Sequence, residues 1–149
     1  MTQPKKEVLI LCTGNSARSQ MAEGLLRAMA GDQVDVASGG TRPVPLNPGA
    51  VAAMAEIGID ISGHRSKSVE EFLGREFDFV ITVCDRARES CPVFPGRARR
   101  FHHDFEDPAA APADRRLAVF RKVRDEIRDW LSTVFLPSLS PGRENGAES

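Results

Sequence analysis

Short apolar segments alternate with segments of helical spacing along this chain, and that alternation restricts the possible folds more than any other feature. Residues 7–11 and 77–83 are nearly all apolar, which is typical of strands buried on both faces of a sheet. Shorter segments at 34–37 and 99–102 predict two further strands. Because strands separated by helices pair in parallel, we expect an α/β fold with a parallel four-stranded sheet flanked by helices on both faces.

Helical signals occur in four segments, at residues 18–29, 47–57, 85–90 and 114–135. Asn47 is a suitable N-cap and Pro48 suits the first turn of its helix. The last helix has an apolar stripe that is predicted to face the core. The stripe consists of Leu117, Phe120, Val123, Ile127, Trp130, Leu131 and Val134. From Pro137 the sequence is rich in Ser, Pro, Gly and Glu, so residues 1–136 are predicted to form one domain and 137–149 a disordered tail.

Charge and cysteine content narrow the possible classes of function. The formal net charge of −1 gives no reason to expect nucleic acid or an anionic membrane as a partner. No apolar run approaches the roughly 20 residues that a membrane helix needs. Three cysteines favour thiol chemistry in a reducing compartment over a disulfide framework, and the adjacent His102 and His103 lack the spacing of a zinc site. We therefore expect a cytoplasmic protein without a metal.

Cys12 opens a loop between the first strand and the first helix, with the pattern C-x5-R-S. Gly14 and Asn15 tolerate conformations that turn backbone N–H groups inward, and such a nest at a helix N-terminus binds a tetrahedral oxyanion. Arg18 could bind two oxygens of that anion with its guanidinium group. The positive electrostatic potential of these N–H groups and of Arg18 favours Cys12 as a thiolate nucleophile, to which Ser19 could donate a hydrogen bond. The predicted anion-binding residues are Thr13, Gly14, Asn15, Ser16, Ala17, Arg18 and Ser19.

A second cysteine and a general acid are candidates for the same site. Cys84 directly follows a buried strand, so it falls on the same carboxyl edge of the sheet as Cys12, where ligands bind in such folds. A carboxylic acid above the loop would protonate a leaving group. Asp104, Glu106 and Asp107 are all candidates, and their spacing does not choose among them.

The stretch "EVLILCTGNSARSQMAEG" at residues 7–24 resembles the opening of the arsenate reductases built on the low-molecular-weight protein tyrosine phosphatase fold. The resemblance continues through residues 37–68, through "FVITVCDRARESCPVFPG" at 79–96 and through "DFEDPA" at 104–109. It covers about residues 6–131, and the combined motifs are specific to that family.

This resemblance assigns roles to individual residues. It implies that Cys12 is the nucleophile, that the loop with Arg18 binds arsenate, and that Asp107 is the general acid. It further implies that Cys84 and Cys91 form a disulfide relay, which thioredoxin reduces as an external partner. No cofactor is implied.

One departure from the family concerns potassium, which some thioredoxin-coupled relatives bind beside the loop. Asn15, Glu23 and Ser38 match that site, but Arg65 and Lys67 stand where a threonine and an aspartate would be expected. Cationic side chains are poor replacements for oxygen ligands. We therefore expect no specific potassium site.

Two alternatives to arsenate reduction stay open. A phosphatase would hydrolyse phosphoesters through Cys12, Arg18 and Asp107, and would need neither Cys84 nor Cys91. A sensor would bind an oxyanion or react through a thiol without turnover. The presence of Cys84 and Cys91 favours reduction over hydrolysis.

The spacing of Cys84 and Cys91 predicts a conformational change. Two turns of helix separate the two residues by roughly 10.5 Å along the axis, whereas a disulfide requires Cα atoms within about 7 Å. The residues between them, 85–90, are polar and too short for a stable isolated helix. We expect oxidation to convert residues 84–96 from a compact to a looped form.

Overall fold

The computed structural model describes residues 4–139 and contains the predicted sheet. The strands are β1 (Lys6–Cys12), β2 (Val34–Gly40), β3 (Phe79–Thr82) and β4 (Arg99–His102). They pair in the order β2-β1-β3-β4, and each pair is parallel. This confirms the α/β class. β2 continues to Gly40, three residues beyond its predicted end at residue 37, because it stays paired with β1 up to Cys12.

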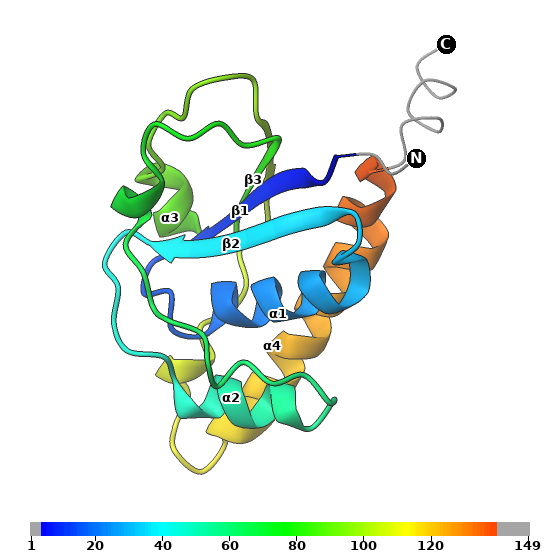
Figure 1. Cartoon of the computed structure of the whole chain (residues 1–149). Helices are drawn as coiled ribbons and strands as arrows, with labels where there is room; N and C mark the ends of the chain where they lie inside the picture. Colours follow the sequence, from blue (N-terminus) through cyan, green and yellow to red (C-terminus); the bar gives the residue numbers. More distant parts are fainter. Residues whose placement is uncertain (1–3, 140–149) are drawn as a thin grey trace.

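Helices of different lengths lie on the two sides of the sheet (Figure 1). The helices are α1 (Arg18–Ala30), α2 (Pro48–Ala55), α3 (Asp85–Glu89) and α4 (Arg116–Trp130), with short 3-10 turns η1 (Val69–Phe72) and η2 (Pro108–Ala110). α1, α2 and α4 lie on one side, where α2 packs against α1 and α4. The other side carries α3 and η1, which are each about one turn long.

The start of α2 follows the sequence closely. Asn47 is its N-cap, with the side-chain Oδ1 accepting a hydrogen bond of 2.8 Å from the Gly49 N–H, and Pro48 is the first helical residue. The helix ends at Ala55, two residues before the predicted end at Ile57, and the chain then turns through Gly58 with a φ of 80°. Glycine adopts that left-handed conformation without steric cost.

The apolar stripe of α4 differs from the prediction at both ends. Leu117 in the first turn is 41% exposed and Val134 is 44% exposed, whereas Phe135 is fully buried. The reason at the C-terminal end is a π-helical turn over Leu131–Phe135, which adds a residue to the turn and rotates Phe135 inward in place of Val134. The chain stays helical through Leu136–Leu139, past the predicted domain end at residue 136. The remainder of the predicted tail, residues 140–149, lies outside the described residues.

The carboxyl edge of the sheet carries the chemistry-bearing side chains. β1 ends at Cys12, which is paired with Gly40 at the end of β2, and Cys84 follows two residues after β3. Between residues 4 and 139, no helix is long and apolar enough to span a membrane.

Candidate active site

A cavity of about 420 Å³ opens at this carboxyl edge, between the loop after β1 and the segments that follow β2 and β3. It is lined by Cys12, Thr13, Gly14, Ser16, Ala17, Arg18, Arg42, Val44, Arg86, Asp107 and Ala109. Most of the predicted loop therefore faces one cavity. Asn15 and Ser19 do not line it, because both residues are fully buried.

The Cys12 thiol is held by two hydrogen-bond partners. Its Sγ accepts a hydrogen bond of 3.1 Å from the Asn15 N–H and lies 2.8 Å from Ser19 Oγ. The Asn15 Nδ2 group donates to Ser19 Oγ at 2.8 Å, so the serine accepts from the amide and its own proton is free for the sulfur. Two donors therefore face Cys12 Sγ, which is the arrangement that supports a thiolate.

Asn15 also fixes the shape of the loop. Its φ of 48° is left-handed, a conformation that asparagine adopts more readily than most residues. Of the two loop residues that the sequence marks as tolerant of such conformations, Asn15 adopts a positive φ, and it is the one non-glycine residue to do so among residues 4–139. The Asn15 Oδ1 accepts from Lys67 N at 2.8 Å, which sets the orientation of its amide.

The segment after β2 lies against the loop and supports it. Arg42 N donates to Thr13 O at 2.8 Å and Val44 N donates to Gly14 O at 2.9 Å. The end of β2 comes so close that a Cβ on Gly40 would lie 2.6 Å from Thr13 O, so this position requires glycine.

A buried chain of hydrogen bonds connects the loop to β2 and α1, and the sequence did not predict which atoms it joins. Asn15 Nδ2 donates to Ser38 Oγ at 2.9 Å, and Ser38 donates in turn to Glu23 Oε1 at 2.6 Å. The other oxygen of Glu23, which is 6% exposed, accepts from Arg27 Nη2 at 2.6 Å. Each buried polar group thus has a partner, and the loop amide is fixed by α1 and β2 together.

The residues matched to a potassium site already have hydrogen-bond donors. Both carboxylate oxygens of Glu23 are engaged, and Lys67 Nζ donates to Arg65 O at 2.9 Å. Burial lowers the pKa of Lys67, an effect that the Glu23 carboxylate opposes by favouring the ammonium. A positive charge near Glu23 leaves little electrostatic attraction for a further monovalent cation.

We expect potassium and sodium to act alike on this protein, because Glu23 is already neutralised by cationic side chains. At equal ionic strength, the melting temperature and the affinity of the pocket for phosphate should be the same in the two salts. Thermal unfolding and titration calorimetry measure both quantities. A clear rise in either one with potassium would contradict the expectation.

Arg18 and Asp107 meet at the cavity. The Arg18 side chain is 13% exposed; its Nη1 donates to Phe105 O at 3.0 Å, and its Nη2 lies 3.9 Å from Asp107 Oδ2. The other two acidic candidates have partners elsewhere: Asp104 Oδ1 accepts from Asp85 N at 2.9 Å, and Glu106 pairs with a lysine of α4. Of the three carboxylates, Asp107 is the one that lines the cavity.

The two remaining cysteines lie on either side of α3. Cys84 is buried and is the N-cap of α3, where its Sγ accepts from Ala87 N at 3.4 Å and lies 3.3 Å from Thr13 Oγ1. Cys91 follows the helix, and its Sγ accepts a hydrogen bond of 3.1 Å from Arg100 Nη1 on β4. All three cysteines are free thiols. Cys84 therefore adjoins the anion-binding loop, whereas Cys91 has different neighbours.

Two arginines of the cavity were missed by sequence reasoning. Arg42 follows β2 and Arg86 belongs to α3, and no local pattern marks either residue as a ligand. Their convergence with Arg18 depends on how separate segments meet at the sheet edge.

The sequence predicts that the adjacent His102 and His103 do not form a zinc site. His102 is placed between Thr82 Oγ1 and Asp85 Oδ1, each at 2.7 Å, and His103 stacks on Phe105. Within the part of the chain that the structure describes, no three His, Cys, Asp or Glu side chains gather as a metal site would require.

Several known proteins resemble this chain in sequence and in fold. Residues 7–140 match the family of low molecular weight phosphotyrosine protein phosphatases. An arsenate reductase of Halalkalibacterium halodurans is 47% identical over 131 residues, which cover 87% of this chain and 94% of that protein. An arsenate reductase 2 of Staphylococcus epidermidis is 43% identical over 124 residues, covering 83% and 92%. The solved structure of an arsenate reductase in the oxidised state superposes with a TM-score of 0.77 at 32% identity, covering 91% of this chain and 99% of that one.

These matches span the strand, loop and helix that form the cavity, and the resemblance seen in the sequence is confirmed. The chain belongs to the low molecular weight phosphotyrosine protein phosphatase family and is an enzyme of that family.

Proposed function

We propose that this protein reduces arsenate to arsenite, with Cys12 as the nucleophile and thioredoxin as the source of electrons. The observation that carries the proposal is the position of Cys84 beside the anion-binding loop, 3.3 Å from Thr13 Oγ1, with Cys91 close in sequence. Phosphoester hydrolysis needs no second or third thiol. The names of the relatives, which are arsenate reductases, support the same reaction.

In the first step, Cys12 attacks arsenic. Arsenate is a tetrahedral oxyanion, and the loop with the uncapped N-terminus of α1 offers backbone N–H groups to its oxygens, while Arg18 offers a guanidinium fork. The Cys12 thiolate forms a sulfur–arsenic bond and one arsenic–oxygen bond breaks. A proton from the Asp107 carboxyl converts the leaving oxygen to water.

In the second step, the electrons move to arsenic. The Cys84 thiolate attacks Cys12 Sγ, and the sulfur–arsenic bonding pair stays on arsenic, which leaves as arsenite. Cys91 then attacks Cys84 Sγ, so the Cys12–Cys84 bond breaks, a Cys84–Cys91 disulfide forms and Cys12 returns as a thiolate. Two thiols have been oxidised and arsenic has gained two electrons.

The third component of the proposal is the reductant. A dithiol such as that of thioredoxin reduces the Cys84–Cys91 disulfide by exchange, so the cycle requires no bound metal or cofactor. Three cysteines favour thiol chemistry over a disulfide framework, which is typical of a reducing compartment, and we infer a cytoplasmic location on that ground.

Phosphoester hydrolysis is the second candidate, because phosphate has the shape and charge of arsenate. The cavity that holds Cys12, Arg18 and Asp107 would bind a phosphate group equally well. The chain has no tyrosine, and apart from Val44 the cavity offers little apolar surface for an aryl group. We infer a weak side activity. A sensor without turnover would have no use for a carboxylic acid at the cavity.

A turnover assay tests the proposal. The wild-type protein should produce arsenite from arsenate over many cycles with thioredoxin, thioredoxin reductase and NADPH, and the rate of NADPH oxidation measures it. Glutathione or mycothiol with their own reductases are the comparison systems. Cys12→Ser should show no turnover with any reductant, because the nucleophile is gone.

Two results would contradict the proposal. One is an absence of arsenite in all reductant systems while a phosphoester is hydrolysed, which would favour the phosphatase. The other is full arsenate turnover by Cys12→Ser, which would exclude Cys12 as the nucleophile.

Oxidation is expected to unfold the segment between the relay cysteines. α3 is five residues long and buries only Ala87, and Cys84 and Cys91 have separate partners, so we expect the disulfide to form only when this short helix unwinds. Amide hydrogen exchange across residues 84–96 should become at least about tenfold faster in the oxidised protein. Mass spectrometry on the same sample identifies the Cys84–Cys91 bond.

The long helix α4 serves as the internal control for this measurement, since its exchange should be the same in both forms. Equal protection of residues 84–96 in both forms, with the disulfide present, would show that the segment accommodates the bond without unwinding.

A further inference from the structure

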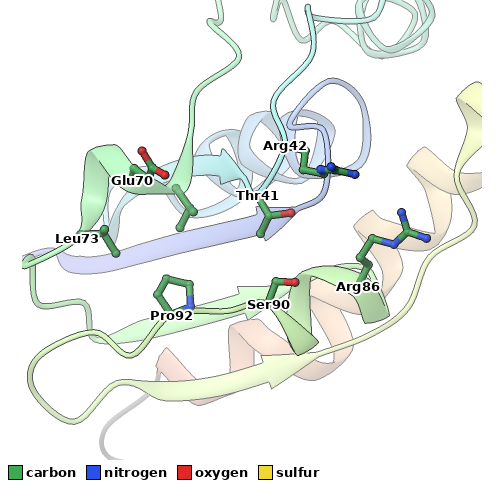
Figure 2. Close-up of a pocket in the computed structure, with 8 residues that line it drawn as sticks. Thr41, Arg42, Glu70, Leu73, Arg86, Ser90 and Pro92 are labelled. Carbon is green, nitrogen blue, oxygen red and sulfur yellow. The ribbon is translucent and has the colours of Figure 1, made fainter.

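A second cavity, of about 540 Å³, adjoins the active-site cavity on the side of α3 (Figure 2). It is lined by Thr41, Arg42, Val69, Glu70, Leu73, Arg86, Ser90 and Pro92. Arg42 and Arg86 line both cavities. Figure 2 shows these two side chains at one end of the second cavity, away from Leu73 and Pro92. The two arginines thus stand where the cavities meet.

Both guanidinium groups are available to an anion. Within residues 4–139, no hydrogen bond or ion pair engages the side chain of Arg42 or Arg86, although other arginines of the same region are paired. Arg88, on the same helix as Arg86, lies 3.7 Å from Asp85. The carboxylate that faces the active-site cavity, Asp107, is already beside Arg18. The active-site cavity is therefore lined by two positive side chains, Arg42 and Arg86, that have no ion-pair partner within residues 4–139.

These two arginines differ in how firmly the fold holds them. The backbone of Arg42 is bonded to the anion-binding loop, through its N–H to Thr13 O at 2.8 Å. Arg86 lies on α3 between Cys84 and Cys91, in the segment that we expect to unwind when the two sulfurs join. A Cys84–Cys91 disulfide is therefore expected to displace Arg86 and to leave Arg42 in place.

We propose that Arg86 binds the oxyanion only while the Cys84–Cys91 pair is reduced, so that the redox state of the pair sets the affinity of the active site for its anion. This inference rests on the proposed function, and it adds a binding residue and a form of regulation to that site. Oxidised enzyme would bind arsenate and phosphate weakly until the reductant restores α3. The spent enzyme would thereby avoid occupation by an anion that it cannot process.

Inorganic phosphate is the probe for this proposal, because it has the charge of arsenate and cannot be reduced. The experiment uses Cys12→Ser, in which Cys84 and Cys91 are the two remaining cysteines. Diamide takes up two electrons and two protons from the two thiols and leaves the disulfide, which mass spectrometry identifies. Isothermal titration calorimetry gives the dissociation constant for phosphate in the reduced and oxidised forms.

The expected loss on oxidation is about tenfold in affinity, the scale of one charge-assisted contact at a partly exposed site. Arg86→Ala in the same background should lose about tenfold in the reduced form and show no further loss on oxidation. Arg42→Ala should bind more weakly in both forms and keep the redox difference. Arg88→Ala, the control on the same helix, should behave like the parent.

Two outcomes would overturn the inference: reduced Arg86→Ala that binds phosphate as tightly as the parent, or a loss on oxidation that is as large in Arg86→Ala as in the parent. Neither depends on catalysis, since Cys12 is absent. The arsenate turnover assay on the wild-type chain tests the proposed function separately.

Discussion

Replacement of Cys91 by serine is expected to limit the enzyme to about one arsenite per chain, followed by arrest. The first two sulfur transfers need Cys12 and Cys84, and both remain. Without the third thiol, the Cys12–Cys84 disulfide stays buried at the base of the cavity, since both cysteines are less than 5% exposed. Rapid-quench measurement of arsenite against enzyme concentration gives the stoichiometry, and mass spectrometry identifies the trapped disulfide.

Replacement of Cys84 should stop the cycle one step earlier. Cys12 can still attack arsenic, but no neighbouring thiol then releases arsenite, so Cys84→Ser should give less than one arsenite per chain. The affinity for phosphate is the internal control for both variants, because neither Cys84 nor Cys91 lines the active-site cavity. Repeated turnover by Cys91→Ser with thioredoxin would exclude the three-cysteine route.

Replacement of Arg18 by alanine is expected to lower kcat/KM for arsenate by about 10²–10³-fold, the range for loss of a preorganised group that stabilises developing charge. The Arg18 side chain is 13% exposed and is held by Phe105 O and Asp107, so its guanidinium is fixed before the anion binds. Steady-state kinetics with saturating thioredoxin measures the loss.

A lysine variant separates the shape of the Arg18 guanidinium from its charge, and a variant on α4 controls for the loss of a distant positive charge. Arg18→Lys keeps the charge but loses the planar fork, so it should recover only a small part of the rate. Arg128→Ala removes the same charge from the half-exposed surface of α4, where Arg128 pairs with Asp125, and should leave kcat/KM unchanged. A rate for Arg18→Lys equal to that of the wild type would show that a point charge is sufficient and that bidentate binding is not required.

The sequence alone determined the local parts of this site. An apolar strand that ends at Cys12, a loop with Asn15 and a helix that begins at Arg18 are neighbours in the chain, and the structure has them within one residue of the predicted bounds. The order of apolar and helical segments also determined the α/β class, because buried parallel strands and covering helices have different periods. Local periodicity and backbone preference are properties of adjacent residues, which is why they could be predicted.

Tertiary structure decided which distant residues join that loop. The spacing of Asp104, Glu106 and Asp107 does not choose among them, and Asp107 alone of the three lines the cavity. Asp104 instead accepts a hydrogen bond from Asp85 N at the start of α3, and Glu106 pairs with a lysine of α4. Arg42 and Arg86 reach the same cavity from segments that follow different strands. Their positions follow from the order β2-β1-β3-β4, which brings the ends of β2 and β3 to either side of β1. Contacts of this kind depend on the packing of the whole sheet, and no window of adjacent residues contains them.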